Sequence, residues 1–289
     1  MCGRYVMARA IGDLVAESGA VEPEEGLDLR ANWNVAPTAD VAVVLERAVP
    51  ASGGPGSADD DGREAGQPGN GEVRREVHVA RWGLVPPWAK DPSTGSRAFN
   101  ARSETVTEKP TFRAAVRARR CAVPVEGYYE WLKPAAGEKG PDGKAARKRP
   151  FYVHPADGSL IFFAGLYEWW KDESVPEGEP GRWLLSCSIL TGPSPEAGTG
   201  DETLERLHAL HDRLPLPMDA GTMDAWLEPV KLPSAEAAAQ LVDRVREQAY
   251  RTASGWTLDE VGPEVGNVRN NGPELLVPAC GPGQQDTLV

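Results

Sequence analysis

Short hydrophobic runs, each bounded by Pro, Gly or charged residues, make up most of the chain's pattern. They are rich in β-branched and aromatic residues, which predicts strands. These runs are 40–49, 76–85, 120–131, 150–155, 159–170 and 182–191. Other stretches carry apolar residues at helical spacing and predict helices over 8–19, 218–228 and 234–250, the last with Ser234 as N-cap.

The order of these elements indicates the fold class. Most of the predicted strands precede the two late helices. That order favours an α+β fold with a largely antiparallel, barrel-like sheet over a βαβ nucleotide-binding fold. The sequence also lacks the GxGxxG, P-loop, HExxH and GxSxG motifs.

Four segments interrupt the pattern, near 50–72, 133–150, 171–181 and 192–202. They are rich in Gly, Pro and charged residues and have little to bury, so we expect them to be loops. None of them separates two hydrophobic halves. The sequence therefore predicts one domain over 1–278 with these insertions, followed by a flexible tail over 279–289.

Composition narrows the possible partners. The 289 residues carry a formal net charge of -12. This charge argues against a protein that binds nucleic acid over a broad basic surface, so any nucleic-acid binding would need a local basic groove. No signal peptide and no apolar run of about 18 residues is present, so we expect a cytoplasmic monomer without membrane contact. Of the four cysteines, Cys121 and Cys187 lie in apolar runs typical of core thiols, and Cys280 lies in the tail.

Cys2 follows the initiator Met1 directly. If Met1 is removed, Cys2 carries a free α-amine and a thiol on adjacent carbons. An α-amine has an ordinary pKa of ~7.7–8.0, so about a tenth of it is neutral at pH 7, far more than of a lysine side chain. Such an amine can form an imine with an aldehyde, and the thiol can then close a five-membered thiazolidine. The alternative is a start site with no chemical role.

The stretch FNARSET (99–105) offers polar groups for binding. It places Asn100 and Arg102 two residues apart, on one face if the segment is extended. An amide and a guanidinium there can hydrogen-bond a sugar or phosphate oxygen. The alternative is a helix entry with Ser103 as N-cap.

Two further stretches offer groups for proton transfer. Glu130 lies among two Tyr and a Trp in VEGYYEW, a setting suited to acid–base chemistry, although a strand glutamate with structural bonds is the alternative. His208 and His211 lie one helical turn apart in LHALHDRLP. No Cys, Asp or Glu partner recurs at ligand spacing, so we expect no metal and no other cofactor.

Seven motifs occur along the chain in a defined order: MCGRY, NWNVAPT, RWGLVPPWAK, FNARSET, RCAVPVEGYYEW, HDRLP and VGNVRNNGPELL. In order and approximate position they are similar to those of the SRAP family, the SOS response-associated peptidase-like proteins. The resemblance runs from Cys2 to about Pro278, with the low-complexity segments as insertions.

The resemblance implies the SRAP α+β fold, with a β-barrel-like core, flanking helices and a groove for single-stranded DNA. It implies a DNA-damage protein that senses abasic sites in single strands. Cys2, exposed by loss of Met1, would form a covalent thiazolidine crosslink with the ring-opened deoxyribose and shield the lesion. The activity would be lyase-like, with autoproteolytic, peptidase-type removal of Met1.

The resemblance also implies roles for residues of the matching motifs. Asn100 would position the Cys2 amine or the sugar, Glu130 would act as general acid–base, and His211 would move a proton on the sugar oxygen. The residues expected to contact DNA are Arg4 and Arg102 on flanking phosphates, Arg213, Pro37 in the pocket lining, and Trp82 or Trp88, stacked on a base or wedged into the duplex junction.

The stretch 97–120 adds a local positive charge. It holds seven Lys or Arg against two Glu, and with Arg4 it could line a positive groove on an acidic protein. The alternative is a basic face in contact with water only.

Two other functions fit parts of the sequence. Glutamine amidotransferases also begin with Cys after Met, often as CG, so a thiol N-terminal-nucleophile hydrolase or peptidase is one alternative. Nothing past CG supports it. The other is a non-covalent module that binds single strands, in which Cys2 has no chemical role.

Overall fold

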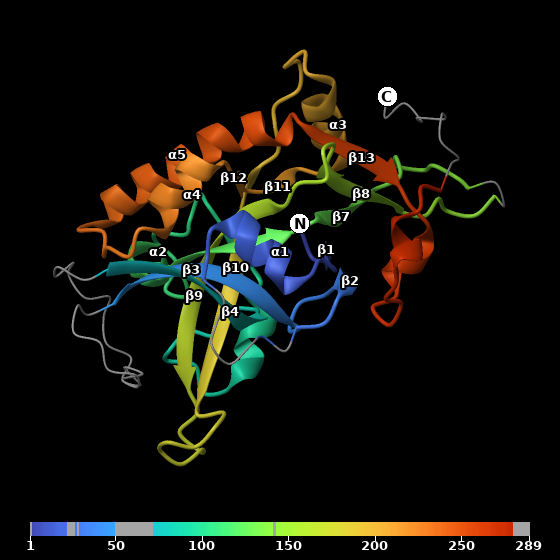
Figure 1. The fold of residues 1–289 in the computed structure, drawn as a ribbon. Coiled ribbons are helices and arrows are strands. Elements are labelled where there is room, and N and C mark those ends of the chain that lie inside the picture. The colour runs from blue at the N-terminus through green and yellow to red at the C-terminus, as the bar shows by residue number, and fades with distance from the viewer. Residues whose placement is uncertain (1, 22–26, 28, 50–71, 141–142, 280–289) are drawn as a thin grey trace.

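The computed structural model describes residues 2–21, 27, 29–49, 72–140 and 143–279. It has two β-sheets with flanking helices, which confirms the α+β class (Figure 1). The insertion predicted at 50–72 lies outside the described residues except for Glu72, and so does the predicted tail except for Ala279.

Five strands close into a barrel. β3 pairs with β4 and β6, β9 pairs with β6 and β10, and β10 returns to β4. Every pair is antiparallel except β4–β10, because a ring with an odd number of alternating strands must contain one parallel pair. The strands are β3 (Asp40–Val49), β4 (Glu72–Trp82), β6 (Arg120–Val125), β9 (Ile161–Lys171) and β10 (Trp183–Pro193).

Both faces of the barrel wall are apolar. Val41, Val43 and Leu45 of β3 pack with the cluster that also holds Cys121 and Cys187, while the alternate residues of β3 pack with a second cluster that includes helix residues. Burial on both faces explains the continuous apolar run in β3. The two cysteines are core thiols, as predicted.

Four helices cover the outside of the barrel: α1 (Ile11–Ser18), α2 (Ala115–Ala118), α4 (Ala220–Leu227) and α5 (Ala235–Ala253). Helices α4 and α5 lie together on one side of it (Figure 1). Ser234 caps α5 as predicted, since its hydroxyl accepts from Ala237 N at 3.2 Å. Trp226 fixes α4 to the wall by donating from Nε1 to Cys121 O at 3.0 Å.

The second sheet is antiparallel, in the order β13-β8-β7-β1-β2. Its strands are β1 (Tyr5–Met7), β2 (Asn32–Val35), β7 (Gly127–Leu132), β8 (Arg149–Pro155) and β13 (Trp256–Glu260). The run predicted as one strand over 120–131 is two strands, β6 in the barrel and β7 in this sheet. The chain turns between them at Glu126, whose carboxylate accepts from Ala8 N and Arg9 N.

Short elements complete the fold around β10 and the chain ends. β5 (Asn100–Arg102) and β11 (Arg213–Pro215) both pair with β10, and β12 (Pro217–Met218) pairs with β9. α3 (Glu202–Leu210) precedes β11. The 3₁₀ helices are η1 (Pro92–Arg97), η2 (Pro263–Gly266) and η3 (Pro273–Leu276). The predicted insertions at 133–150, 171–181 and 192–202 fall largely between elements.

Candidate functional site

Cys2 lies where the five-stranded sheet meets the barrel. It precedes β1 and packs, fully buried, in the cluster that fills the barrel. Burial raises the pKa of its thiol to about 12, and the nearby charge of Glu130 adds to the rise. The thiol is therefore protonated at neutral pH and needs a base before it can act as a nucleophile.

Asn100 holds Cys2 from the barrel side. Its Nδ2 donates to the backbone oxygen of Cys2 at 2.7 Å. Asn100 Oδ1 is buried, and among the described residues nothing donates to it. β5 is extended and Ala101 between its ends is buried, so Asn100 and Arg102 share a face as predicted, and Ser103 caps no helix. Asn100 thus has one amide group engaged with Cys2 and one acceptor available.

Glu130 lies on β7, which pairs with β1 in the five-stranded sheet. Only 5% of it is exposed, and its Oε1 accepts from Trp131 N at 3.1 Å. The charge of Glu130 acts on Cys2, on Tyr128 and on His211, raising the pKa of the first two groups and opposing the fall at the third. The carboxylate therefore lies within electrostatic range of both the thiol and the imidazole.

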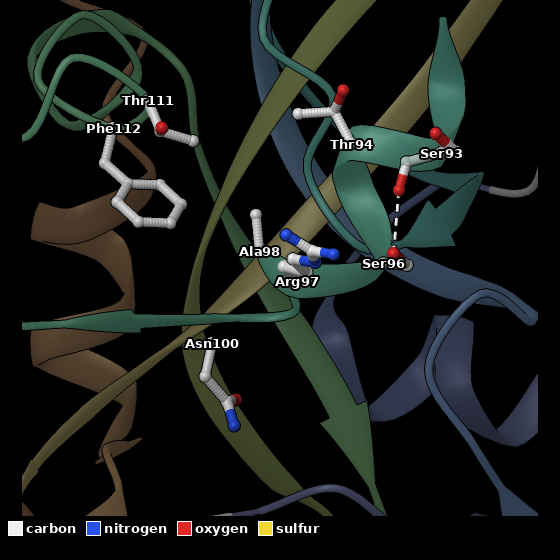
Figure 2. Close-up of a pocket in the computed structure, with 8 residues that line it drawn as sticks. All are labelled: Ser93, Thr94, Ser96, Arg97, Ala98, Asn100, Thr111 and Phe112. Atoms are coloured by element: carbon white, nitrogen blue, oxygen red, sulfur yellow. Dashed lines mark hydrogen bonds between the residues drawn. The ribbon is translucent and has the colours of Figure 1, made fainter.

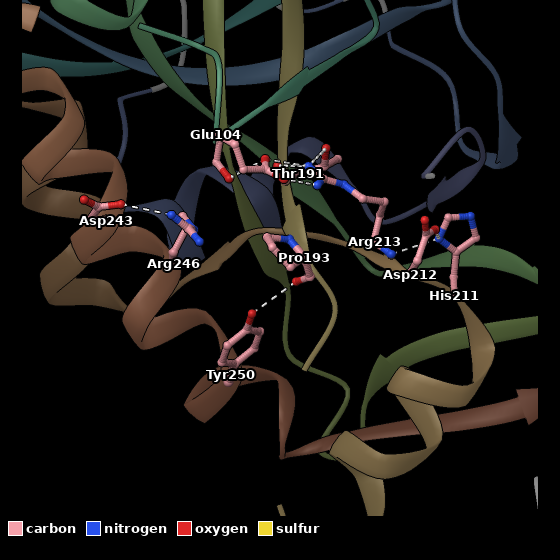
Figure 3. A network of polar contacts seen from close by, with 10 residues as sticks. Glu104, Thr191, Pro193, His211, Asp212, Arg213, Asp243, Arg246 and Tyr250 are labelled. Carbon is pink, nitrogen blue, oxygen red and sulfur yellow. Dashed lines mark hydrogen bonds and ion pairs between the residues drawn. The ribbon is translucent and has the colours of Figure 1, made fainter. Parts of the chain in front are cut away.

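His211 caps the C-terminus of α3 and leads into β11. Its Nδ1 accepts from Arg213 N at 3.0 Å and lies 2.8 Å from Asp212 Oδ1 (Figure 3). Desolvation lowers the pKa of the ring below its ordinary value, so His211 is neutral at pH 7. His208, in contrast, points its Nδ1 at Pro195 O, 2.8 Å away, and plays no part in this group.

An open groove of about 660 Å³ runs past Asn100 (Figure 2). A second hollow of about 270 Å³ shares several of its residues and continues it. The cations among the described lining residues are Arg97, Arg102 and Lys109, and no carboxylate lines either part. The other lining residues are Ser93, Thr94, Ser96, Ala98, Phe99, Asn100, Thr105, Thr111 and Phe112. The groove is thus locally positive on an acidic protein.

Two of the three arginines predicted to contact DNA have partners inside the protein. Arg213 donates to both carboxylate oxygens of Glu104 and to Thr191 O, with 10% of its side chain exposed. Arg4 lies outside the groove and donates to Asn34 Oδ1 at 2.9 Å and to Val265 O at 3.0 Å. Arg102 is exposed and lines the groove.

The two candidate stacking residues differ completely in exposure. Trp82 is fully buried, packs against Tyr5 with ring centroids 4.9 Å apart, and donates to Phe99 O at 2.9 Å. Its place in the core contradicts stacking on a base. Trp88 is 63% exposed. Pro37 is half-buried beside Thr38, the one non-glycine residue with positive φ among those described.

The basic stretch 97–120 divides into two halves. Arg117, Arg119 and Arg120 bind backbone carbonyls or Glu168 within the fold, which corrects the prediction that they line a groove. The first half supplies the groove cations. The sequence did not indicate Phe112 or the hydroxyls of η1 as groove residues. The only signal for the hydroxyls is the polar run PSTGS shortly before FNARSET.

Within the described ranges, no three His, Cys, Asp or Glu side chains are grouped to hold a metal ion. No helix in that part of the chain is long and apolar enough to span a membrane.

Comparisons with known proteins find relatives over most of the chain. The family model for SOS response associated peptidase (SRAP) matches residues 1–268. The chain is 28% identical over 278 residues to abasic site processing protein YoqW of Bacillus subtilis, covering 96% of this chain and 99% of that protein. It is 26% identical to abasic site processing protein HMCES of Xenopus tropicalis, covering 70% and 57%.

A solved structure shares the fold. The crystal structure of a protein from Bacteroides thetaiotaomicron superposes with a TM-score of 0.65 at 20% sequence identity, covering 96% of this chain and all of that one. The family model spans both the barrel and the five-stranded sheet, and with them Cys2, Asn100, Glu130 and His211. The chain therefore belongs to the SRAP family.

Proposed function

We propose that this protein processes abasic sites in single-stranded DNA by forming a thiazolidine crosslink through Cys2 after loss of Met1. The observation that carries the proposal is the double role of Asn100. Its side chain binds Cys2 O at 2.7 Å and also lines the positive groove. A strand in the groove would thus bring a sugar to Cys2. The relatives named abasic site processing proteins support this substrate class.

Binding of the strand is assigned to the groove. Arg97, Arg102 and Lys109 can contact successive phosphates, and the ring of Phe112 offers a face for base stacking. An open groove with these cations suits a flexible single strand. The lesion exposes an aldehyde at C1′, the one group in DNA that a 1,2-aminothiol traps selectively.

The reaction starts from the amine. Met1 removal, by the protein itself or by another peptidase, turns the amide nitrogen of Cys2 into an amine. The amine adds to C1′ of the open-chain sugar, and the carbinolamine loses water to give an imine. A neutral His211 with its proton can assist departure of the oxygen as water. Asn100 Oδ1, which is buried without a donor, can accept from the new amine and orient it.

The thiol closes the ring in the second step. Its sulfur bonds to the imine carbon, and its proton ends on the ring nitrogen, so no oxidant or reductant is needed. Because burial keeps the thiol pKa near 12, the thiol reacts only when a base takes its proton. That transfer is assigned to Glu130, whose charge acts on both Cys2 and His211.

The test uses an oligonucleotide with a single abasic site and a denaturing gel. The mature protein should form a stable adduct, and an oligonucleotide with a tetrahydrofuran in place of the sugar should form none, since it has no aldehyde. Cys2→Ala and Cys2→Ser both lack the thiol but keep the α-amine once Met1 is removed. Neither should form a stable adduct, and an imine adduct of either should appear only after borohydride reduction. A stable adduct with Cys2→Ala would refute the thiazolidine.

A further inference from the structure

Glu104 and Arg213 form a clamp between two motifs that are far apart in the sequence. Arg213 Nη2 donates to Glu104 Oε2 at 2.9 Å, and Nη1 contacts Oε1 (Figure 3). The same Nη2 lies 2.7 Å from Thr191 O and 3.2 Å from Thr191 Oγ1 on β10. A bidentate pair of this kind fixes the guanidinium in both position and orientation.

The clamp reaches His211 through one backbone group. Arg213 N donates to His211 Nδ1 at 3.0 Å, so the place of the Arg213 backbone decides whether Nδ1 keeps this donor. When Nδ1 accepts a hydrogen bond, the proton of the neutral ring must sit on Nε2. The clamp thereby selects one of the two tautomers.

A second group competes for the same nitrogen. Asp212 Oδ1 lies 2.8 Å from Nδ1, and a carboxylate there favours a proton on Nδ1. The Asp212 side chain is 84% exposed, so water weakens its hold. Glu130 also favours a charged ring, while Lys133 opposes it. Without a fixed Arg213 N–H, these charges would leave His211 as a mixture of its two tautomers.

We propose that Glu104 is a positioning residue for His211, acting through Arg213 to hold the backbone N–H on Nδ1 and the proton on Nε2. The inference rests on the proposed function, in which His211 transfers a proton at the sugar. Glu104 itself is not among the described residues that line the groove.

The sign of the expected effects separates this role from a DNA-binding one. Glu104 carries a negative charge close to Arg102 in sequence and beside the groove. Neutralising it removes repulsion toward phosphates and frees Arg213, so DNA should bind equally or more tightly. A positioning residue, in contrast, should slow the chemical step. Tighter binding with slower crosslinking is the signature.

The experiment compares Glu104→Gln with Glu108→Gln, both in the mature protein. Glu108 is an exposed carboxylate in the same turn, and among the described residues its side chain has no hydrogen bond or ion pair. With a saturating abasic oligonucleotide, Glu104→Gln should crosslink about tenfold more slowly, part of the 10²–10⁴ that acid–base catalysis supplies. Glu108→Gln should crosslink at the wild-type rate. Fluorescence anisotropy should show undiminished affinity in both.

A spectroscopic measurement makes the inference independent of rate. In ¹⁵N-labelled wild-type protein, His211 should show the protonated-Nε2 tautomer alone, and Glu104→Gln should show a mixture. Glu104→Asp, which keeps the carboxylate, should restore part of the rate and tests the clamp if the amide variant folds poorly. Equal rates and one tautomer in Glu104→Gln and Glu108→Gln would overturn the inference. A wild-type protein that forms no adduct would instead refute the proposed function.

Discussion

Glu130 is the residue whose proposed role depends most on its surroundings. It is buried beside a protonated thiol and a neutral imidazole. Glu130→Gln keeps the shape of the side chain but removes the base, so crosslinking should slow by ~10²–10⁴-fold while DNA binding is retained. Single-turnover gel assays at saturating protein measure the rate, and anisotropy measures the binding.

Glu126→Gln is the matched control for that change. Glu126 is a nearby carboxylate at the turn between β6 and β7. It accepts hydrogen bonds from the backbone N–H groups of Ala8 and Arg9 instead of acting on Cys2. Its replacement should lower stability and leave the rate per folded molecule unchanged. Loss of DNA binding in Glu130→Gln would mean that Glu130 has a structural role.

The Glu104–Arg213 clamp has its own pH signature. The hydrogen bond from Arg213 lowers the pKa of Glu104 from 4.5 to about 2. Because the folded-state pKa is the lower one, the pair stabilises the fold above pH 4.5, and this stabilisation is lost as pH falls toward 2. The difference in unfolding free energy between wild type and Glu104→Gln should therefore shrink over that range. Urea titrations at several pH values measure it.

Glu108→Gln is the control for that change, since among the described residues no ion pair holds the exposed Glu108. A Glu104→Gln difference that stays constant from pH 7 to pH 2 would contradict the ion pair.

At the scale of elements, the start of β6 carries a buried cation. Arg120 donates to Trp226 O at 2.7 Å, to Glu228 O at 2.6 Å and to Val230 O at 3.0 Å, and so fixes the end of α4 to the barrel. Arg120→Met removes the side-chain donor from all three carbonyls and leaves Glu228 O with only the N–H of Val230 at 2.8 Å, so it should cost about 3 kcal/mol of unfolding free energy. Urea denaturation checks the value.

Arg113→Met provides the comparison, since Arg113 is exposed seven positions earlier in the same basic stretch. Its stability change should stay within about 0.5 kcal/mol. Equal losses in the two variants would mean that Arg120 does not fix α4.

Long elements could be predicted from the sequence, and short ones could not. The run 40–49 coincides with β3, and Ser234 marks the start of α5, because local composition decides both. β5 and β11 have three residues each and exist only because they pair with β10. Such pairing depends on the distant strand, so no local pattern announces it.

The same reason explains the errors at the site. Arg102 and Arg213 both stand in family motifs, and nothing local tells them apart. The structure does so because β10 lies between β5 and β11 and brings Glu104 against Arg213. Local sequence does not show that Trp82 is buried either, because its side chain faces the barrel interior together with that of Ala80. Cys2, Asn100, Glu130 and His211 gather because the two sheets meet there.

For the whole molecule, charge is the property that the proposed function must overcome. The formal net charge is -12, yet the groove presents three cations and no carboxylate among its described lining residues. Long-range attraction to DNA is therefore absent, and affinity must come from contacts inside the groove. Such contacts release counterions one by one, so they should be visible in the salt dependence of binding.

Replacing Arg97, Arg102 and Lys109 together by Gln should make the negative slope of log K, the DNA association constant, against log salt concentration shallower by about 2. Each single-strand phosphate contact contributes ~0.7 to the steepness of that slope. The control replaces Arg74, Arg244 and Arg251, which are exposed but line neither part of the groove. It makes the same change in net charge, so a global field would shift both variants alike. Anisotropy titrations from 50 to 200 mM salt separate the two, and equal slopes would place the DNA outside the groove.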